Sequence, residues 1–263
     1  MVFDRDAFDK FTIRNKCVRF AKTEEDYFLV DPRRSSQRSP YYIDYRKLTT
    51  IKKLEECSNY EAEFIETNGI NVRGLVPLGI PDNGVRLANF LTTTLSDRLK
   101  LKPKIVQPRK KPEKEASTYI GKNFIGEIES GDEFFIIEDV PTTAASIHYI
   151  IRLINDCARF EHIHLRYGKV LILCDRREMR ANEQLSGLEV HALTHIHSLL
   201  PKAAQMLDID PKIVKACQEY YNEVGSEWDK KRDENIGNPD YWSSFGFKLG
   251  KQSSKQGREK SRV

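Results

Sequence analysis

The chain has 263 residues, of which 39% are hydrophobic and 31% charged, and its formal net charge at pH 7 is +4. This composition supplies a hydrophobic core and excludes a wholly disordered chain, and no apolar stretch reaches the roughly 18–20 residues that a membrane-spanning helix needs. The first ten residues mix charges and lack the apolar segment of a secretory signal. We therefore expect a soluble protein of the cytoplasm that does not bind membranes.

The positive charge is concentrated at the C-terminal end. Residues 248–263 carry six basic residues and one acidic residue, so the other 247 residues together have a net charge of −1. We interpret this basic tail as solvated and disordered. A second basic run lies at 100–111, but no aromatic residues interleave with it, so binding of nucleic acid is the disfavoured alternative.

The cysteines and histidines form no recognisable ligand set. The five cysteines are scattered and never form a CxxC pair, which predicts reduced thiols instead of disulfides or a zinc site. His191, His195 and His197 lie close in sequence, but no cysteine or acid completes a usual ligand spacing. We therefore expect no bound transition metal.

Apolar runs and helical periodicities alternate along the chain. They predict strands at about 41–45, 71–78, 104–107, 134–140, 169–174 and 188–193, with helices at about 47–66, 85–98, from residue 142 onward, and at about 210–225. Strands that are apolar on both faces and alternate with helices indicate a mostly parallel sheet covered on both sides. The predicted fold class is therefore α/β, with a small N-terminal cap and a C-terminal helical extension. In such sheets the ligands bind at the carboxyl ends of the strands.

The same patterns divide the chain into four parts. We predict a cap at 1–46, a core at 47–207, a helical extension at 208–247 and a disordered basic tail at 248–263. Trp228, Trp242 and Phe245 in the extension would dock either on the core or on a second subunit, and the sequence does not distinguish these alternatives.

The segment FFIIEDVPTTAAS carries the most informative motif. A buried strand ends at Glu138 and Asp139, and Thr142, Thr143 and Ser146 then start a helix. The N–H groups at a helix start bind anions, whereas paired carboxylates suit sugar hydroxyls and a hard cation such as Mg²⁺. The motif therefore predicts a sugar-phosphate pocket. An ordinary strand-to-helix turn with a threonine N-cap would show the same pattern.

This motif resembles the sugar-phosphate signature of the type I phosphoribosyltransferases. Other segments, found in the expected order over roughly residues 25–200, resemble the orotate phosphoribosyltransferases within that family. They are SPYYID at 39–44 with Arg34 before it, LGIPDNGVRLA at 78–88, QPRK at 107–110 and LCDR at 173–176.

The resemblance implies an activity and a set of substrates. Phosphoribosyl pyrophosphate (PRPP), carrying Mg²⁺ near Glu138 and Asp139, would donate its phosphoribosyl group to orotate, which gives orotidine 5′-monophosphate and pyrophosphate in pyrimidine biosynthesis. Glu138 and Asp139 would hold the ribose hydroxyls, and the turn after them would hold the 5′-phosphate. A homodimer is also implied.

The resemblance assigns a role to each matching residue. The loop that begins at residue 108 would close over the site as a lid and neutralise pyrophosphate. For PRPP the implied residues are Arg109, Lys110, Lys114, Glu138, Asp139, Thr142, Thr143, Ala144, Ala145 and Ser146, of which Asp139, Lys114 and Arg109 are the catalytic ones. For orotate they are Arg34, Tyr41, Tyr42, Thr142 and Arg176. A guanidinium can pair with the orotate carboxylate through two hydrogen bonds.

Three features depart from the family pattern. Glu115 or Ala116, depending on the alignment, stands where a loop histidine is usual, and the alanines at 144–145 replace two glycines. Helical dihedral angles would still let the alanine N–H groups donate. Residues 82–83 also enlarge the loop expected to hold pyrophosphate. Two alternatives therefore stay open: a non-catalytic regulator that binds a nucleotide or PRPP, and a transferase for another base.

Overall fold

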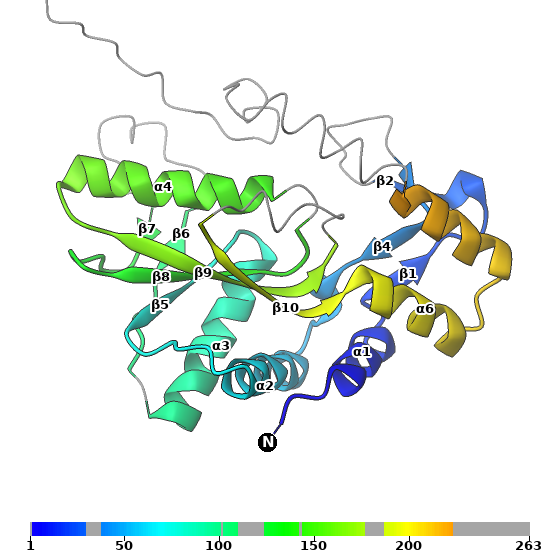
Figure 1. The fold of residues 1–263 in the computed structure, drawn as a ribbon, viewed down its shortest axis with the longest axis horizontal. Helices are drawn as coiled ribbons and strands as arrows, with labels where there is room; N and C mark the ends of the chain where they lie inside the picture. The colour runs from blue at the N-terminus through cyan, green and yellow to red at the C-terminus, as the bar shows by residue number, and fades with distance from the viewer. Residues whose placement is uncertain are drawn as a thin grey trace, which may run out of the picture.

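A four-stranded parallel sheet with the order β10-β9-β8-β5 forms the centre of the protein (Figure 1). The computed structural model describes residues 2–29, 38–100, 102–109, 124–141, 144–176 and 187–222. The strands are β5 (Leu75–Gly79), β8 (Glu133–Glu138), β9 (Arg166–Asp175) and β10 (Glu189–His195). The predicted α/β class with a mostly parallel sheet is confirmed.

Helices cover both faces of this sheet. α2 (Ile51–Thr67) and α3 (Asn83–Leu99) lie on one face, and α4 (Ala145–Glu161) lies on the other (Figure 1). Side chains alternate along β8, so Phe135 and Ile137 join the hydrophobic cluster of α2 and α3, whereas Phe134 and Ile136 join that of α4. Burial on both faces explains why the strands read as continuous apolar runs.

The N-terminal residues pack on the same core. α1 (Arg5–Arg14) is followed by β1 (Val18–Phe20), which pairs antiparallel with β4 (Tyr41–Ile43), and β2 (Phe28–Leu29) pairs with β3 (Arg38–Ser39). Short 3₁₀ turns lie at Glu24–Asp26 and Tyr45–Lys47. Asp4 caps α1, because its side chain accepts hydrogen bonds from the N–H groups of Asp6 and Ala7. Phe8 and Tyr45 share one hydrophobic cluster with Leu171 of β9.

Two segments differ from the sequence prediction. The strand expected at 104–107 is β6 (Gln107–Pro108), and it pairs antiparallel with β7 (Phe124–Ile125) outside the main sheet. The helix α6 (Ile196–Met206) was not predicted, because Pro201 inside it conceals a helical pattern. That pattern is visible in its buried residues Ile196, Leu199, Leu200, Ala203 and Ala204.

Residues 211–222 form a further helix, as predicted. All five cysteines are buried and free. Within the described ranges, no helix combines the length and the apolar character that crossing a membrane requires.

Candidate active site

The carboxyl ends of the four central strands meet at one edge of the sheet. Gly79 of β5 lies opposite Ile137 of β8, and Asp175 of β9 lies opposite His195 of β10. Because parallel strands run in the same direction, the chain segments that follow them share this edge. It is the edge at which open α/β sheets bind their ligands.

Backbone and side-chain hydrogen bonds fix the two acids after β8. Oε1 of Glu138 accepts a hydrogen bond from the N–H of Asp139 at 3.2 Å, and Oδ1 of Asp139 accepts one from the N–H of Val140 at 2.8 Å. The hydroxyl of Ser146, in the first turn of α4, donates to Oε2 of Glu138. Burial, and then the charge of Asp139, raise the pKa of Glu138 well above its ordinary value of 4.5. The sheet therefore presents two adjacent carboxyls at its edge, one of which binds its proton more tightly than an ordinary glutamate.

The loop between β5 and α3 lies directly against the acid pair. Nδ2 of Asn83 donates a hydrogen bond to Oδ2 of Asp139 at 2.9 Å. Two glycines permit this approach: a Cβ on Gly84 would lie 2.6 Å from the carbonyl oxygen of Ile137, and one on Gly79 would lie 2.1 Å from that of Gly84. The motif LGIPDNG marked this loop in the sequence, but the contact with Asp139 was not predicted.

The turn into α4 differs from the conformation expected for its alanines. Ala145 begins the helix, but Ala144 has φ of +52° and lies in the left-handed region. Helical angles, the condition under which we expect the alanine N–H groups to donate, are therefore met at Ala145 but not at Ala144. Thr142 and Thr143 lie outside the described residues.

A buried arginine and a tyrosine form a second part of the site. Arg176, which directly follows β9, is 4% exposed, and its Nη2 donates to Oγ of Ser39 at 3.2 Å. Its guanidinium lies 4.6 Å from the ring centroid of Tyr41, and the ring of Tyr220 contacts Tyr41 edge-on at 5.9 Å. The β4 segment is thus brought to the end of β9, although more than 130 residues separate them. Sequence reasoning missed Tyr220, because no motif marks it.

Tyr42 takes part in a different cluster. Successive side chains of a strand point to opposite faces, so Tyr42 leaves the side occupied by its neighbour Tyr41. Its hydroxyl accepts a hydrogen bond from Nη2 of Arg46 at 2.8 Å, and its ring lies 5.7 Å from that of Phe28. The structure does not bring Tyr42 to Arg176. Arg34 lies outside the described residues.

A short hairpin forms the base of the expected mobile loop. β6 and β7 pair with each other, and half-buried Arg109 directly follows β6. Nε2 of Gln107 donates to Oδ1 of Asn89 on α3 at 3.0 Å, which ties this hairpin to the core. Lys110 and Lys114 lie in the stretch 110–123, outside the described residues.

His191 contacts an acid and His197 an aromatic ring. Nε2 of His191 lies 2.7 Å from Oε1 of Glu189, and the ring of His197 contacts that of Tyr221 edge-on at 4.2 Å. Where the structure describes the chain, no three His, Cys, Asp or Glu side chains gather as metal ligands.

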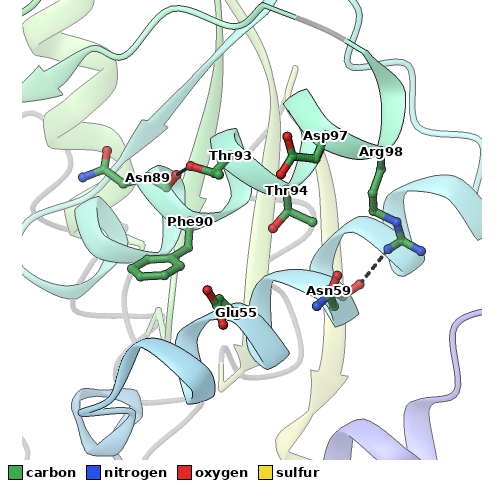
Figure 2. Close-up of a pocket in the computed structure, with 8 residues that line it drawn as sticks. All are labelled: Glu55, Asn59, Asn89, Phe90, Thr93, Thr94, Asp97 and Arg98. Atoms are coloured by element: carbon green, nitrogen blue, oxygen red, sulfur yellow. Dashed lines mark hydrogen bonds between the residues drawn. The ribbon is translucent and has the colours of Figure 1, made fainter.

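A separate groove of about 410 Å³ lies between α2 and α3 (Figure 2). Along α3 its lining extends from Asn89 to Arg98, which at 1.5 Å per residue places it roughly 9–22 Å along the helix from Asn83. Nη1 of Arg98 donates to the carbonyl oxygen of Asn59 at 3.3 Å across this groove (Figure 2). The groove is therefore not part of the site at the sheet edge.

Comparisons with solved structures define the class of the fold. The uridine monophosphate (UMP) synthase of Leishmania donovani has a TM-score of 0.61 at 21% identity, covering 82% of this chain and 42% of that one. The orotate phosphoribosyltransferase of Francisella tularensis has a TM-score of 0.59 at 18% identity, covering 82% and 98%. The parallel sheet flanked by helices is the fold of the type I phosphoribosyltransferases.

Comparisons with curated proteins show which enzymes of this class the chain is similar to in sequence. The orotate phosphoribosyltransferase of Methanocaldococcus jannaschii is 29% identical over 70% of this chain and 89% of its own length. That of Pyrococcus furiosus is 26% identical over 74% and 94%. No family model matches the chain. The chain is therefore similar to the orotate phosphoribosyltransferases in sequence and has the type I phosphoribosyltransferase fold, in agreement with the resemblance of its motifs.

Proposed function

We propose that the protein transfers the phosphoribosyl group of PRPP to orotate, forming orotidine 5′-monophosphate and pyrophosphate. A ring nitrogen of orotate forms a bond to the anomeric carbon and loses its proton, while the bond from that carbon to pyrophosphate breaks and its electrons leave with pyrophosphate. The observation that carries the proposal is the placement of Arg176. Its buried guanidinium lies over Tyr41 at the same edge of the sheet as Glu138 and Asp139.

The geometry supports a division of roles. Arg176 would pair with the orotate carboxylate through two hydrogen bonds, and Tyr41 keeps the guanidinium plane in place. Asp139 and Glu138 would accept hydrogen bonds from the ribose hydroxyls. Ser146, at the start of α4, lies where the N–H groups and the helix dipole favour the 5′-phosphate.

The remaining roles concern the leaving group. Arg109, with Lys110 and Lys114 of the loop, would neutralise the negative charge that develops on pyrophosphate, and closure of the loop would exclude water. We propose that Mg²⁺ enters with PRPP near the acids, since Mg²⁺ at phosphate sites is bound through one or two carboxylates and the substrate phosphates. Bound there, it supplies further positive charge to the pyrophosphate oxygens.

The proposal includes a homodimer in the cytoplasm. The homodimer is supported by the family resemblance alone. In that family the mobile loop reaches the site of the neighbouring subunit. Light scattering of the purified protein at several concentrations measures the mass directly. A monomer that still turned over orotate would contradict the shared site.

The loss of orotate absorbance in the presence of PRPP and Mg²⁺ tests the activity. We expect turnover in the wild type and loss of turnover in Arg176→Ala. Arg19→Ala is the matched control, because Arg19 also lies over aromatic rings of the cap, at 5.1 Å from Phe28. Turnover that persisted in Arg176→Ala would contradict the proposed orotate site.

A non-catalytic nucleotide binder is the second candidate. The observation that favours it is Ala144, because a Cβ at a left-handed position restricts the approach of a phosphate to the backbone. Such a protein would bind PRPP in a calorimeter and give no product with orotate. Product with another base would instead identify a transferase of different specificity.

A further inference from the structure

Asn83 is placed between two parts of the site. It is the first residue of α3, it is 5% exposed, and its Nδ2 donates to Oδ2 of Asp139 at 2.9 Å. The two residues lie 56 positions apart, on loops that follow the neighbouring strands β5 and β8. Asn83 therefore links the loop after β5 to the acid pair.

This hydrogen bond completes the fixation of Asp139. Its Oδ1 accepts from the N–H of Val140 at 2.8 Å, and its Oδ2 accepts from Asn83. Two donors on different oxygens hold the plane of a carboxylate in one orientation. Hydrogen bonds to an ionised acceptor are also the stronger kind. Without Asn83, Oδ2 would lose its donor and the N–H of Val140 alone would hold the carboxylate.

The other end of the same amide points to a ligand. Oδ1 of Asn83 is buried and accepts no hydrogen bond from any residue that the structure describes. A buried carbonyl oxygen without a donor is costly, so it is usually satisfied by protein, water or ligand. An O–H group would satisfy it, whereas a phosphate oxygen would not, because both atoms are acceptors.

We infer that Asn83 is a positioning residue of the ribose subsite. Its amide nitrogen holds Asp139, and its amide oxygen accepts a hydrogen bond from an O–H group, either a ribose hydroxyl or a water molecule on a hydrated cation. This inference rests on the proposed function, because it takes PRPP as the ligand. It assigns the loop after β5 a role in binding the ribose. The basic loop that follows β6 is expected to neutralise the charge of pyrophosphate.

The variants Asn83→Asp and Asn83→Leu distinguish the role of the amide nitrogen, a donor, from that of the amide oxygen, an acceptor. Asn83→Asp keeps an acceptor and loses the donor, and it adds a third carboxyl to the pair Glu138 and Asp139. Asn83→Leu loses both the donor and the acceptor.

The same helix supplies a matched control. Asn89 uses its oxygen, which accepts from Nε2 of Gln107 at 3.0 Å, whereas Asn83 uses its nitrogen. Asn89→Asp therefore makes the same chemical change on α3 but keeps its hydrogen bond.

Calorimetric titration of PRPP into the four proteins at pH 8, with and without Mg²⁺, tests the inference. The loss of one charge-assisted hydrogen bond predicts an affinity about tenfold weaker for Asn83→Asp at pH 8. We expect an equal or larger loss for Asn83→Leu, and no more than about a twofold change for Asn89→Asp. A loss in Asn83→Leu that is independent of Mg²⁺ identifies the ribose hydroxyl as the donor, and one that requires Mg²⁺ identifies the bound water.

Two results would overturn the inference, and both differ from a failure of the proposed function. One is wild-type affinity in both Asn83 variants, and the other is a loss in Asn89→Asp as large as that in Asn83→Asp, since Asn89→Asp leaves the contact between Asn83 and Asp139 intact. A thermal melt of each variant confirms that it is folded, and Asn83→Asp alone suffices if Asn83→Leu does not fold. Failure of the proposed function would appear in the wild type, as absence of PRPP binding or of product.

Discussion

The guanidinium of Arg176 lies 4.6 Å from the ring centroid of Tyr41, with both side chains buried. A cation over an aromatic face is attracted by the ring quadrupole, more strongly where water is excluded. Oγ of Ser39 also accepts a hydrogen bond from Nη2 of Arg176 at 3.2 Å, so the guanidinium is held from two directions. The arrangement fixes the orientation of the guanidinium plane.

Tyr220 is predicted to support this arrangement from the C-terminal helix. Its ring contacts Tyr41 edge-on at 5.9 Å, and an aromatic pair contributes about 0.5–1.5 kcal/mol beyond area burial. We expect Tyr220→Ala to raise the KM for orotate about two- to tenfold, as this free energy implies, and to leave the KM for PRPP unchanged.

Steady-state kinetics with each substrate varied in turn measures this split. Tyr220→Phe keeps the ring and serves as the control, with a KM for orotate close to that of the wild type. Equal increases in both KM values for Tyr220→Ala would indicate general loosening of the fold and contradict the role in the base subsite.

Gly84 is predicted to be irreplaceable for a steric reason. A Cβ there would lie 2.6 Å from the carbonyl oxygen of Ile137, and neither backbone can move without disturbing β8 or α3. Overpacking of this kind costs about 1–3 kcal/mol, so we expect Gly84→Ala to lower the free energy of unfolding by at least that amount. Urea denaturation followed by circular dichroism measures it.

Gly168→Ala is the matched control for Gly84→Ala. In β9 the nearest atom to a Cβ on Gly168 is Oε1 of Glu133, at an ordinary contact distance of 3.8 Å. The same substitution is therefore accommodated, and we expect no loss of stability. Equal destabilisation at both positions would show that close packing is not the cause.

Much of the site could be predicted from the sequence, because its parts follow strands. Continuous apolar runs placed Glu138, Asp139 and Arg176 at strand ends, and parallel strands bring their carboxyl ends together. The contact between Asn83 and Asp139 was not accessible in this way, since it depends on two glycines that let α3 approach β8.

Two other features depend on tertiary structure in the same way. The left-handed conformation of Ala144 opposes the local preference of alanine, so only the surrounding fold imposes it. Tyr220 reaches Tyr41 through the packing of a terminal helix, and the sequence around it carries no motif for this contact.

Glu61 is predicted to reduce stability as the pH rises. It is fully buried in α2, both of its carboxylate oxygens lack a hydrogen-bond partner among the described residues, and burial raises its pKa well above the ordinary value of 4.5. The folded state therefore binds a proton that the unfolded chain releases near pH 4.5. The contribution of Glu61 to stability is most favourable below this pH and is lost as the pH rises above it.

Glu61→Met removes the buried carboxyl at similar volume. We expect it to raise the free energy of unfolding by about 1–4 kcal/mol at pH 8, and by less at pH 5. Denaturation curves at both pH values measure the change, and Glu56→Met, at an exposed position of the same helix, should be nearly neutral. A gain from Glu61→Met that was the same at both pH values would contradict titration of this carboxyl.

Ala144 connects backbone conformation to ligand binding. An L-residue in the left-handed region costs roughly 1–2 kcal/mol, which glycine avoids. Against this, Ala144 is 1% exposed, so Ala144→Gly also loses about 0.8 kcal/mol of methyl burial and up to about 1 kcal/mol through the greater freedom of the unfolded chain. These effects nearly cancel, and we expect the free energy of unfolding to change by less than about 1 kcal/mol.

Ala144→Gly should change the affinity for a phosphate ligand, although it hardly changes the stability of the fold. Removing the Cβ lets a phosphate approach the N–H groups at the start of α4 more closely, so we expect Ala144→Gly to bind ribose 5-phosphate more tightly in a calorimeter. Lys100→Gly is the control, because Lys100 has the same φ of +52° at an exposed helix end far along the chain from this turn. It should gain about 0.5–1 kcal/mol of stability without any change in affinity. Unchanged affinity in Ala144→Gly would show that the alanine does not restrict the phosphate subsite.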